Sequence, residues 1–248
     1  MTSTAILARR NLLHVLTDPQ QLIGMTVQPM MFLLLFVYVF GGAIAGSSHA
    51  YMQFVLPGLV VQGVAFMAMQ TAVGLNSDFT HGLIDRFRSL PIARSAVVAG
   101  RIVADVTRIA WGAVITVAVG VAFGFRPHTS VAAMIAALGM ILAWGFALSW
   151  LMALLGISLR SPESVQTAGF LVVMPLTFAS AVFAPAASMP GWLQAFVTHN
   201  PVTLVADSVR GLLLGGPVAR PVLESAAWLA SITLVSWTLA VRQYRARG

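Results

Sequence analysis

Long apolar runs separated by short polar segments dominate the pattern along the chain. A helix needs about 20 apolar residues to cross the hydrocarbon core of a bilayer, and six runs reach that length. The runs lack the alternation of polar and apolar residues that the strands of a membrane barrel show, so helices are predicted. The predicted spans are residues 22–45, 54–77, 97–125, 131–157, 165–187 and 222–241.

Composition supports this interpretation and excludes several kinds of site. Hydrophobic residues make up 58% of the 248 residues and charged residues 8%, whereas soluble domains carry about 25% charged residues. The sequence predicts one all-α integral membrane domain over residues 1–248. All 14 basic residues are arginine, so the lysine of a Walker-type phosphate loop is missing. The absence of cysteine excludes thiolate metal sites and cysteine nucleophiles.

The arginines outside the spans predict the orientation. Ten lie in segments on one side and three in segments on the other, with Arg108 near the inner end of the third span. Basic residues concentrate on the cytoplasmic side, so both termini are predicted to be cytoplasmic. The ten are Arg9, Arg10, Arg86, Arg88, Arg94, Arg101, Arg160, Arg242, Arg245 and Arg247, and the three are Arg126, Arg210 and Arg220.

Three further segments complete the predicted layout. Residues 1–19 place apolar positions on one side at helical spacing, which predicts an interfacial helix before the first span. Residues 188–221 are too apolar for a solvated loop and too interrupted for a span, which predicts short outer helices that re-enter the membrane. Asn200 and Pro201 suit the N-cap and first position of one such helix, and Asp207 and Arg210 can pair on it. An outer amphipathic cap without a mechanistic role is the alternative. Residues 242–248 form a cytoplasmic tail.

The cytoplasmic segment 78–96 contains a compact charged helix. Leu83, Phe87 and Leu90 share one face, arginines spread over the rest, and Gly82 and Pro91 bracket a fixed length. A solvated loop helix that only sets the topology requires charge but no apolar face. A helix that docks into a groove of a partner requires both.

Polar residues in or near the spans suggest two more sites. Gln62, Gln70 and Asn76 lie in the second span, where they either hydrogen-bond between helices or line a substrate path. Arg101, Asp105 and Arg108 share one face of the third span near its inner end, as structural support or as an inner gate. None of the acidic residues lies near a span centre, and the five histidines are divided between the two sides. This pattern disfavours a proton-driven secondary transporter and an intramembrane enzyme.

Two stretches resemble a known family. GLIDRFRSLPIARSAVVAGRIVADVTR, residues 82–108, resembles the cytoplasmic coupling segment of type-2 ABC transporter permeases, most of all the daunorubicin-resistance-type efflux permeases. NPVTLVADSVRGLLLGG, starting at Asn200, is similar to the family pattern after the fifth span. Asp85 stands where many members carry Glu. The resemblance assigns Gly82, Asp85, Arg86, Leu90, Pro91 and Arg94 to coupling, and the pattern of the same helix adds Leu83, Phe87 and Arg88.

The resemblance implies a division of labour. This chain would be a permease without an ATPase site or a bound cofactor, and a separate ATP-binding subunit, present in two copies, would bind ATP and Mg. A second permease chain, identical or related, would complete the path. By analogy, residues 190–216 would form an outer gate that includes Asn200, Pro201, Asp207 and Arg210.

The cargo expected from the resemblance is amphipathic or lipophilic, such as a drug, an antibiotic or a lipid, exported across the plasma membrane of a bacterium. Export of a polysaccharide or glycolipid is the alternative. The residues do not decide between them, nor between a homodimer and a heterodimer.

Overall fold

The computed structural model describes residue 27 and residues 30–80 and 94–246. This part of the chain consists of helices joined by turns and loops, and it contains no strand. The predicted interfacial helix at 1–19 and most of the coupling segment lie outside the described residues. The elements are η1 (Phe36–Phe40), α3 (Gly41–Ala45), α4 (Ser48–Thr80), α6 (Arg94–Ala122), α7 (Val131–Ser158), α8 (Pro162–Phe178), η2 (Ala186–Ser188), α9 (Gly191–Val197), α10 (Pro201–Leu214) and α11 (Ala219–Ala246).

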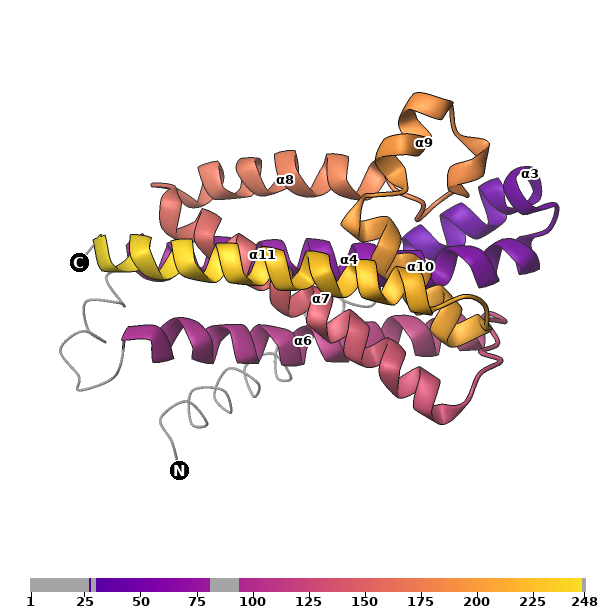
Figure 1. Ribbon diagram of the computed structural model, residues 1–248, viewed down its shortest axis with the longest axis horizontal. Coiled ribbons are helices and arrows are strands. Elements are labelled where there is room, and N and C mark those ends of the chain that lie inside the picture. Colours follow the sequence, from indigo (N-terminus) through magenta and orange to yellow (C-terminus); the bar gives the residue numbers. More distant parts are fainter. Residues whose placement is uncertain (1–26, 28–29, 81–93, 247–248) are drawn as a thin grey trace.

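The long helices lie side by side and form an elongated bundle (Figure 1). The proximal end, on the left, is where α4 ends, α6 begins, α7 passes into α8, and α11 reaches the C-terminus. The distal end, on the right, holds α3, the turn between α6 and α7, and the short helices α9 and α10. Both ends are therefore built from segments that are far apart in the sequence.

Helix α4 forms the centre of the bundle, where it packs against α6, α7, α8 and α10. A Cβ atom on Gly156 of α7 would lie 2.5 Å from the carbonyl oxygen of Ala72, so only glycine allows α7 to approach α4 this closely. Nearer the distal end, Trp144 of α7 is fully buried and donates from Nε1 to the carbonyl oxygen of Val61 over 3.1 Å. Small residues and a buried indole thus fix the contact between α4 and α7.

Four helices are long and apolar enough to cross a membrane, and they correspond to four of the predicted spans. They cover residues 48–78, 105–122, 131–158 and 219–243. Where the first span was predicted at 22–45, the described residues contain a shorter apolar helix, Met30–Ala45, which winds as the π-helix η1 before α3. The chain is a multi-pass membrane protein.

The fifth predicted span, 165–187, does not continue as one helix. Helix α8 ends at Phe178, and the chain then continues through turns at the distal end to η2. Its last carbonyl groups bond to a side chain outside the helix, because Asn200 donates from Nδ2 to the carbonyl oxygens of Leu176 (2.8 Å) and Ala179 (2.7 Å). Apolar composition continues beyond Phe178, but these tertiary hydrogen bonds end the helix.

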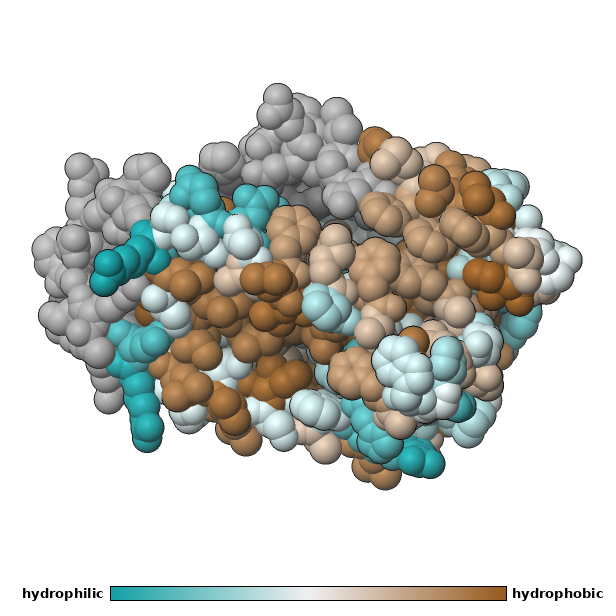
Figure 2. Space-filling view, turned by 90° about the horizontal axis from the view of Figure 1, so that it is seen from above, coloured by the Kyte–Doolittle hydropathy of each residue, from teal (hydrophilic) through white to brown (hydrophobic). Residues whose placement is uncertain are grey.

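The surface of the bundle suits a lipid environment. Large apolar side chains are exposed along α6, α8 and α11, among them Trp111, Leu171 and Leu234. Figure 2 shows one face on which apolar residues form a broad band, with hydrophilic residues gathered mainly toward the two ends. Lipid tails can cover this band, whereas the interior of the bundle is filled by α4.

Candidate functional site

The predicted site residues fall into regions that the structure describes to different extents. Of the coupling residues, only Arg94 belongs to the described part, where it begins α6, and residues 82–91 lie outside it. Arg101 is part of α6, but its side chain is not among those that the structure describes. The remaining predicted residues lie in two regions, one at the distal end and one between α4, α6 and α7.

Arg210 is the centre of the distal region. It forms the predicted ion pair with Asp207, one turn earlier on α10. Its Nε donates to the carbonyl oxygen of Phe54 over 3.0 Å, and its Nη2 donates to that of Ala181 over 3.2 Å. The guanidinium carbon also lies 4.0 Å from the centroid of the Phe54 ring, within the range of a cation–π contact. Arg210 therefore fastens α10 to α4 and to the segment that follows α8.

Asn200 also connects two helices of this region, and its role as N-cap of α10 is confirmed. Its Oδ1 accepts from the backbone N–H of Val202 over 2.8 Å, which satisfies one of the free donors at the start of the helix. The same side chain donates to the end of α8, as described above. One buried amide thus joins the last turn of α8 to the first turn of α10, and Pro201 follows at the first helical position.

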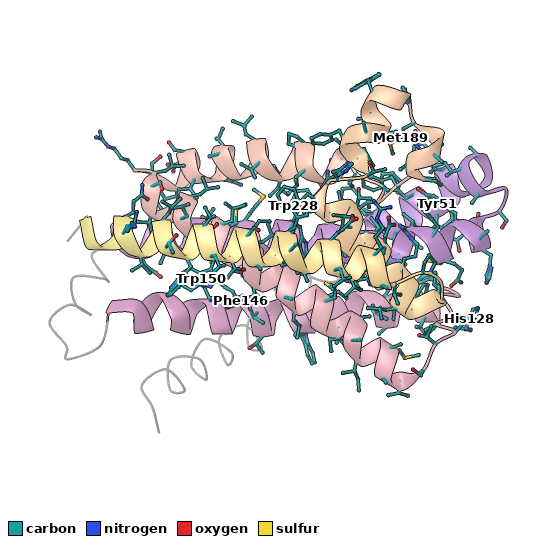
Figure 3. The ribbon with its side chains drawn as sticks, viewed as in Figure 1. Tyr51, His128, Phe146, Trp150, Met189 and Trp228 are labelled. Carbon is teal, nitrogen blue, oxygen red and sulfur yellow. The ribbon has the colours of Figure 1, made fainter. Side chains whose placement is uncertain are left out.

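Further side chains at the distal end, not predicted from the sequence, hold it together. Tyr51 donates from its hydroxyl to the carbonyl oxygen of Phe183 (2.7 Å), Gln53 donates to that of Gly124 (2.9 Å), and Thr203 accepts from the N–H of Ala181 (2.9 Å). Figure 3 places Tyr51, His128 and Met189 at this end. The hydrogen-bond partners of Tyr51, Gln53 and Thr203 are backbone groups of distant segments, so no spacing in the sequence indicates these bonds.

The inner region contains the second ion pair. Nη2 of Arg108 on α6 lies 3.3 Å from Oδ1 of Asp105, one turn earlier, and both side chains are largely buried. Nη2 of Arg108 also donates to the carbonyl oxygen of Met67 on α4, over 3.1 Å. Asp105 and Arg108 thus share one face of α6, as predicted, and Arg108 joins the middle of α6 to α4.

The three polar residues of the predicted substrate path do not share one environment. Asn76 is buried and donates to the carbonyl oxygens of Gly156 (2.9 Å) and Leu159 (2.8 Å) at the end of α7, so it is an interhelical fastener. Gln62 is also buried, whereas Gln70 is exposed on the described surface. For Asn76 the structural interpretation is therefore the better one.

The helices and their charged side chains indicate the class of protein. Within residues 30–80 and 94–246, no group of three His, Asp or Glu side chains gathers as metal ligands would. The charged side chains instead connect helices of a membrane bundle at two levels along its length. The chain is a multi-pass helical membrane protein whose helices are joined by polar side chains at the distal end and near the middle of the bundle.

Comparison with known proteins identifies the family. The model of the ABC-2 type transporter family matches residues 2–214, and the chain belongs to this family. It is 40% identical over 197 residues to the daunorubicin resistance ABC transporter permease protein DrrB1 of Streptomyces coeruleorubidus, which covers 79% of this chain and 70% of that protein.

Two more distant relatives cover a similar extent. Identity is 27% over 238 residues (95% of this chain, 85% of the relative) to the probable doxorubicin resistance ABC transporter permease protein DrrC of Mycobacterium tuberculosis. It is 25% over 215 residues (84% and 72%) to the putative transport permease ycf38 of Cyanophora paradoxa. The predicted resemblance to drug-resistance ABC permeases is thus confirmed, and the chain is an ABC transporter permease.

Proposed function

We propose that this chain is the membrane subunit of an ATP-driven exporter whose cargo is amphipathic or lipophilic. The observation that carries the proposal is its 40% identity to a permease named for daunorubicin resistance. Hydrolysis of ATP with Mg takes place on a separate subunit, and two permease chains and two ATP-binding subunits form the transporter.

The coupling step is assigned to residues 82–94, with the proximal end on the cytoplasmic side. The arginine count of the sequence supports this orientation. Closure of the ATP-binding subunits pushes on the helix that carries Asp85 and Arg86, and α6 transmits the movement into the bundle because it follows directly in the chain. The distal end, fastened through Arg210 and Asn200, acts as the outer gate, while Asp105 and Arg108 act at the inner one.

The proposal is tested by efflux of daunorubicin or doxorubicin from cells that co-express the chain with an ATP-binding subunit. The double variant Asp85→Ala/Arg86→Ala is expected to abolish efflux while the chain still reaches the membrane, because the docking contact is lost. The matched control is Arg160→Ala/Glu163→Ala, which removes one acid and one exposed arginine at the same end of the bundle. Efflux like wild type in the first variant would contradict the coupling assignment.

Two further results separate the parts of the proposal. The purified chain without a partner is expected to show no ATP hydrolysis, and robust hydrolysis would overturn the division of labour. If coupling requires Asp85 and Arg86 but neither drug is exported, the cargo assignment is wrong and export of a polysaccharide or glycolipid becomes the next hypothesis to test.

A further inference from the structure

The hydrophobic core of the described residues is divided into two clusters. The larger cluster runs through most of the bundle and includes Val64, Ile109 and Met152. The smaller one, near the proximal end, is built around Leu75, Ile102, Trp150, Ala153, Ile157 and Ala240. Figure 3 shows Trp150 on α7, in the proximal half of the bundle. Four polar residues on α4, α6 and α7 lie close in the sequence to members of both clusters.

The packing of the three helices places these polar residues within two helical turns of one contact. A Cβ atom on Gly145 would lie 3.0 Å from Ile109 and 3.2 Å from Val64, so α4, α6 and α7 meet there. One to two turns nearer the proximal end, the same helix faces carry Thr71, Asp105 and Ser149. Beyond them, the faces are apolar again, with the smaller cluster.

Arg108 belongs to this polar layer as well. The carbonyl oxygen of Met67, to which Arg108 donates, is the acceptor that an α-helix uses for the N–H of residue 71. The guanidinium group therefore lies at the helical turn that contains Thr71. The polar layer is defined here as Thr71, Asp105, Arg108 and Ser149.

Several polar atoms of this layer are buried without a partner. The side chains of Thr71 and Ser149 are both 0% exposed, and neither hydroxyl has a hydrogen-bond partner among the described residues. The Nε of Arg108 is likewise buried and unpaired within the described part of the chain. Buried polar groups in folded proteins are almost always hydrogen-bonded, to protein or to ordered water. Three unpaired groups on adjoining helices, within two turns of the Gly145 contact, indicate that they bond to a partner other than the described side chains and backbone.

We propose that the polar layer is a binding site for internal water. The unpaired groups are one obligatory donor, the Nε–H of Arg108, and two hydroxyls that both donate and accept. Water can accept from Nε–H and donate to a hydroxyl oxygen at the same time. A metal cation cannot accept from Nε–H and is repelled by the guanidinium, and an anion is repelled by Asp105. The donor and acceptor set therefore fits a small neutral molecule that makes both kinds of hydrogen bond.

Bound water gives this level of the bundle a property that the two apolar clusters lack. Water molecules exchange hydrogen-bond partners without leaving a buried group unpaired, so α6 can shift against α4 and α7 at low cost. The inference depends on the packing of these three helices and holds whichever cargo the permease moves.

The test is radiolytic hydroxyl-radical labelling of the full-length chain in lipid nanodiscs, with oxidation read at methionines by mass spectrometry. Radicals form from bound water itself, so a buried methionine beside internal water is oxidised. Met152, 0% exposed, lies one turn after Ser149 on α7. The internal control is Met69, which is also buried but faces Gly169 of α8. Oxidation of Met152 several times faster than that of Met69 is expected, and equal rates would overturn the proposal.

A second measurement uses Thr71→Val and Ser149→Ala, which keep the shape of the layer and remove its hydroxyls. If the layer holds water, the double variant loses the fast oxidation of Met152, and its thermal midpoint falls because the water and Arg108 lose partners. If the layer is dry, the substitutions remove unpaired buried groups, and the midpoint stays or rises. A higher midpoint with unchanged oxidation would refute the water site.

Discussion

The two Asp–Arg pairs of the bundle have the same spacing but different surroundings. Asp207 and Arg210 on α10, like Asp105 and Arg108 on α6, are separated by three residues. Arg210 uses Nε and both terminal nitrogens for the carboxylate and for two backbone carbonyls on other segments. Arg108 reaches a single backbone carbonyl, that of Met67, and leaves its Nε unpaired among the described residues.

The difference shows that the role of an ion pair in this bundle depends on what else surrounds the guanidinium group. A buried pair contributes to stability only when its remaining hydrogen-bonding atoms are satisfied. The distal pair meets this condition, partly because the segment after α8 offers carbonyl groups that no helix uses, such as that of Ala181. We therefore interpret the distal pair as a fixed clasp and the inner pair as a contact that can exchange partners.

The largest effect is expected from Arg210→Ala, which breaks the clasp. The carbonyl groups of Phe54 and Ala181 lose their donor and Asp207 loses its counter-charge, so the free energy of unfolding should fall by about 3 kcal/mol. Thermal unfolding in mild detergent measures the loss. Arg210→Lys should recover part of it, because lysine keeps the charge but not the planar fork.

The control for this variant is Arg126→Ala at the same end of the bundle. Arg126 is exposed and donates to the carbonyl oxygens of Val121 (2.8 Å) and Phe125 (3.2 Å). Its loss should shift the unfolding midpoint far less, since water replaces both bonds. If the two variants unfold at the same temperature, Arg210 is not a clasp.

A smaller effect is expected from Asn200, which serves two helices with two different atoms. Asn200→Ala removes the N-cap of α10 and the donor for α8, with a cost of about 2 kcal/mol. Asn200→Asp keeps the acceptor Oδ1 and removes the amide donor, so it should retain the cap and lose the bonds to Leu176 and Ala179. Thermal unfolding and helix content by circular dichroism measure both variants. An aspartate variant as stable as wild type would show that the link to α8 contributes nothing.

Local signals made part of this structure predictable from the sequence. Continuous apolar runs predicted α4, α6, α7 and α11, because helices of that length need no partner to define them. The start of α10 was predicted, since Asn200 and Pro201 act within one turn of that helix end.

Features that depend on distant segments could not be predicted. The end of α8 at Phe178 depends on the amide of Asn200, and the partner of Arg108 is a backbone carbonyl of another helix. Thr71 and Ser149 gave no signal, because serine and threonine within apolar helices usually bond to their own backbone. Only the absence of such a partner in the described structure distinguishes them.

The smallest effect on stability is expected from Arg220, whose replacement should leave the unfolding temperature unchanged. Arg220 pairs with Glu224 over 2.7 Å at the start of α11, with a spacing close to that of the two Asp–Arg pairs. The arginine is 83% exposed, so water and salt screen the attraction and replace the bond when it is lost. Arg220→Ala should unfold at the temperature of wild type, at low and high salt alike. A clear loss of stability would mean that sequence spacing, rather than the surroundings of the guanidinium group, determines what these pairs contribute.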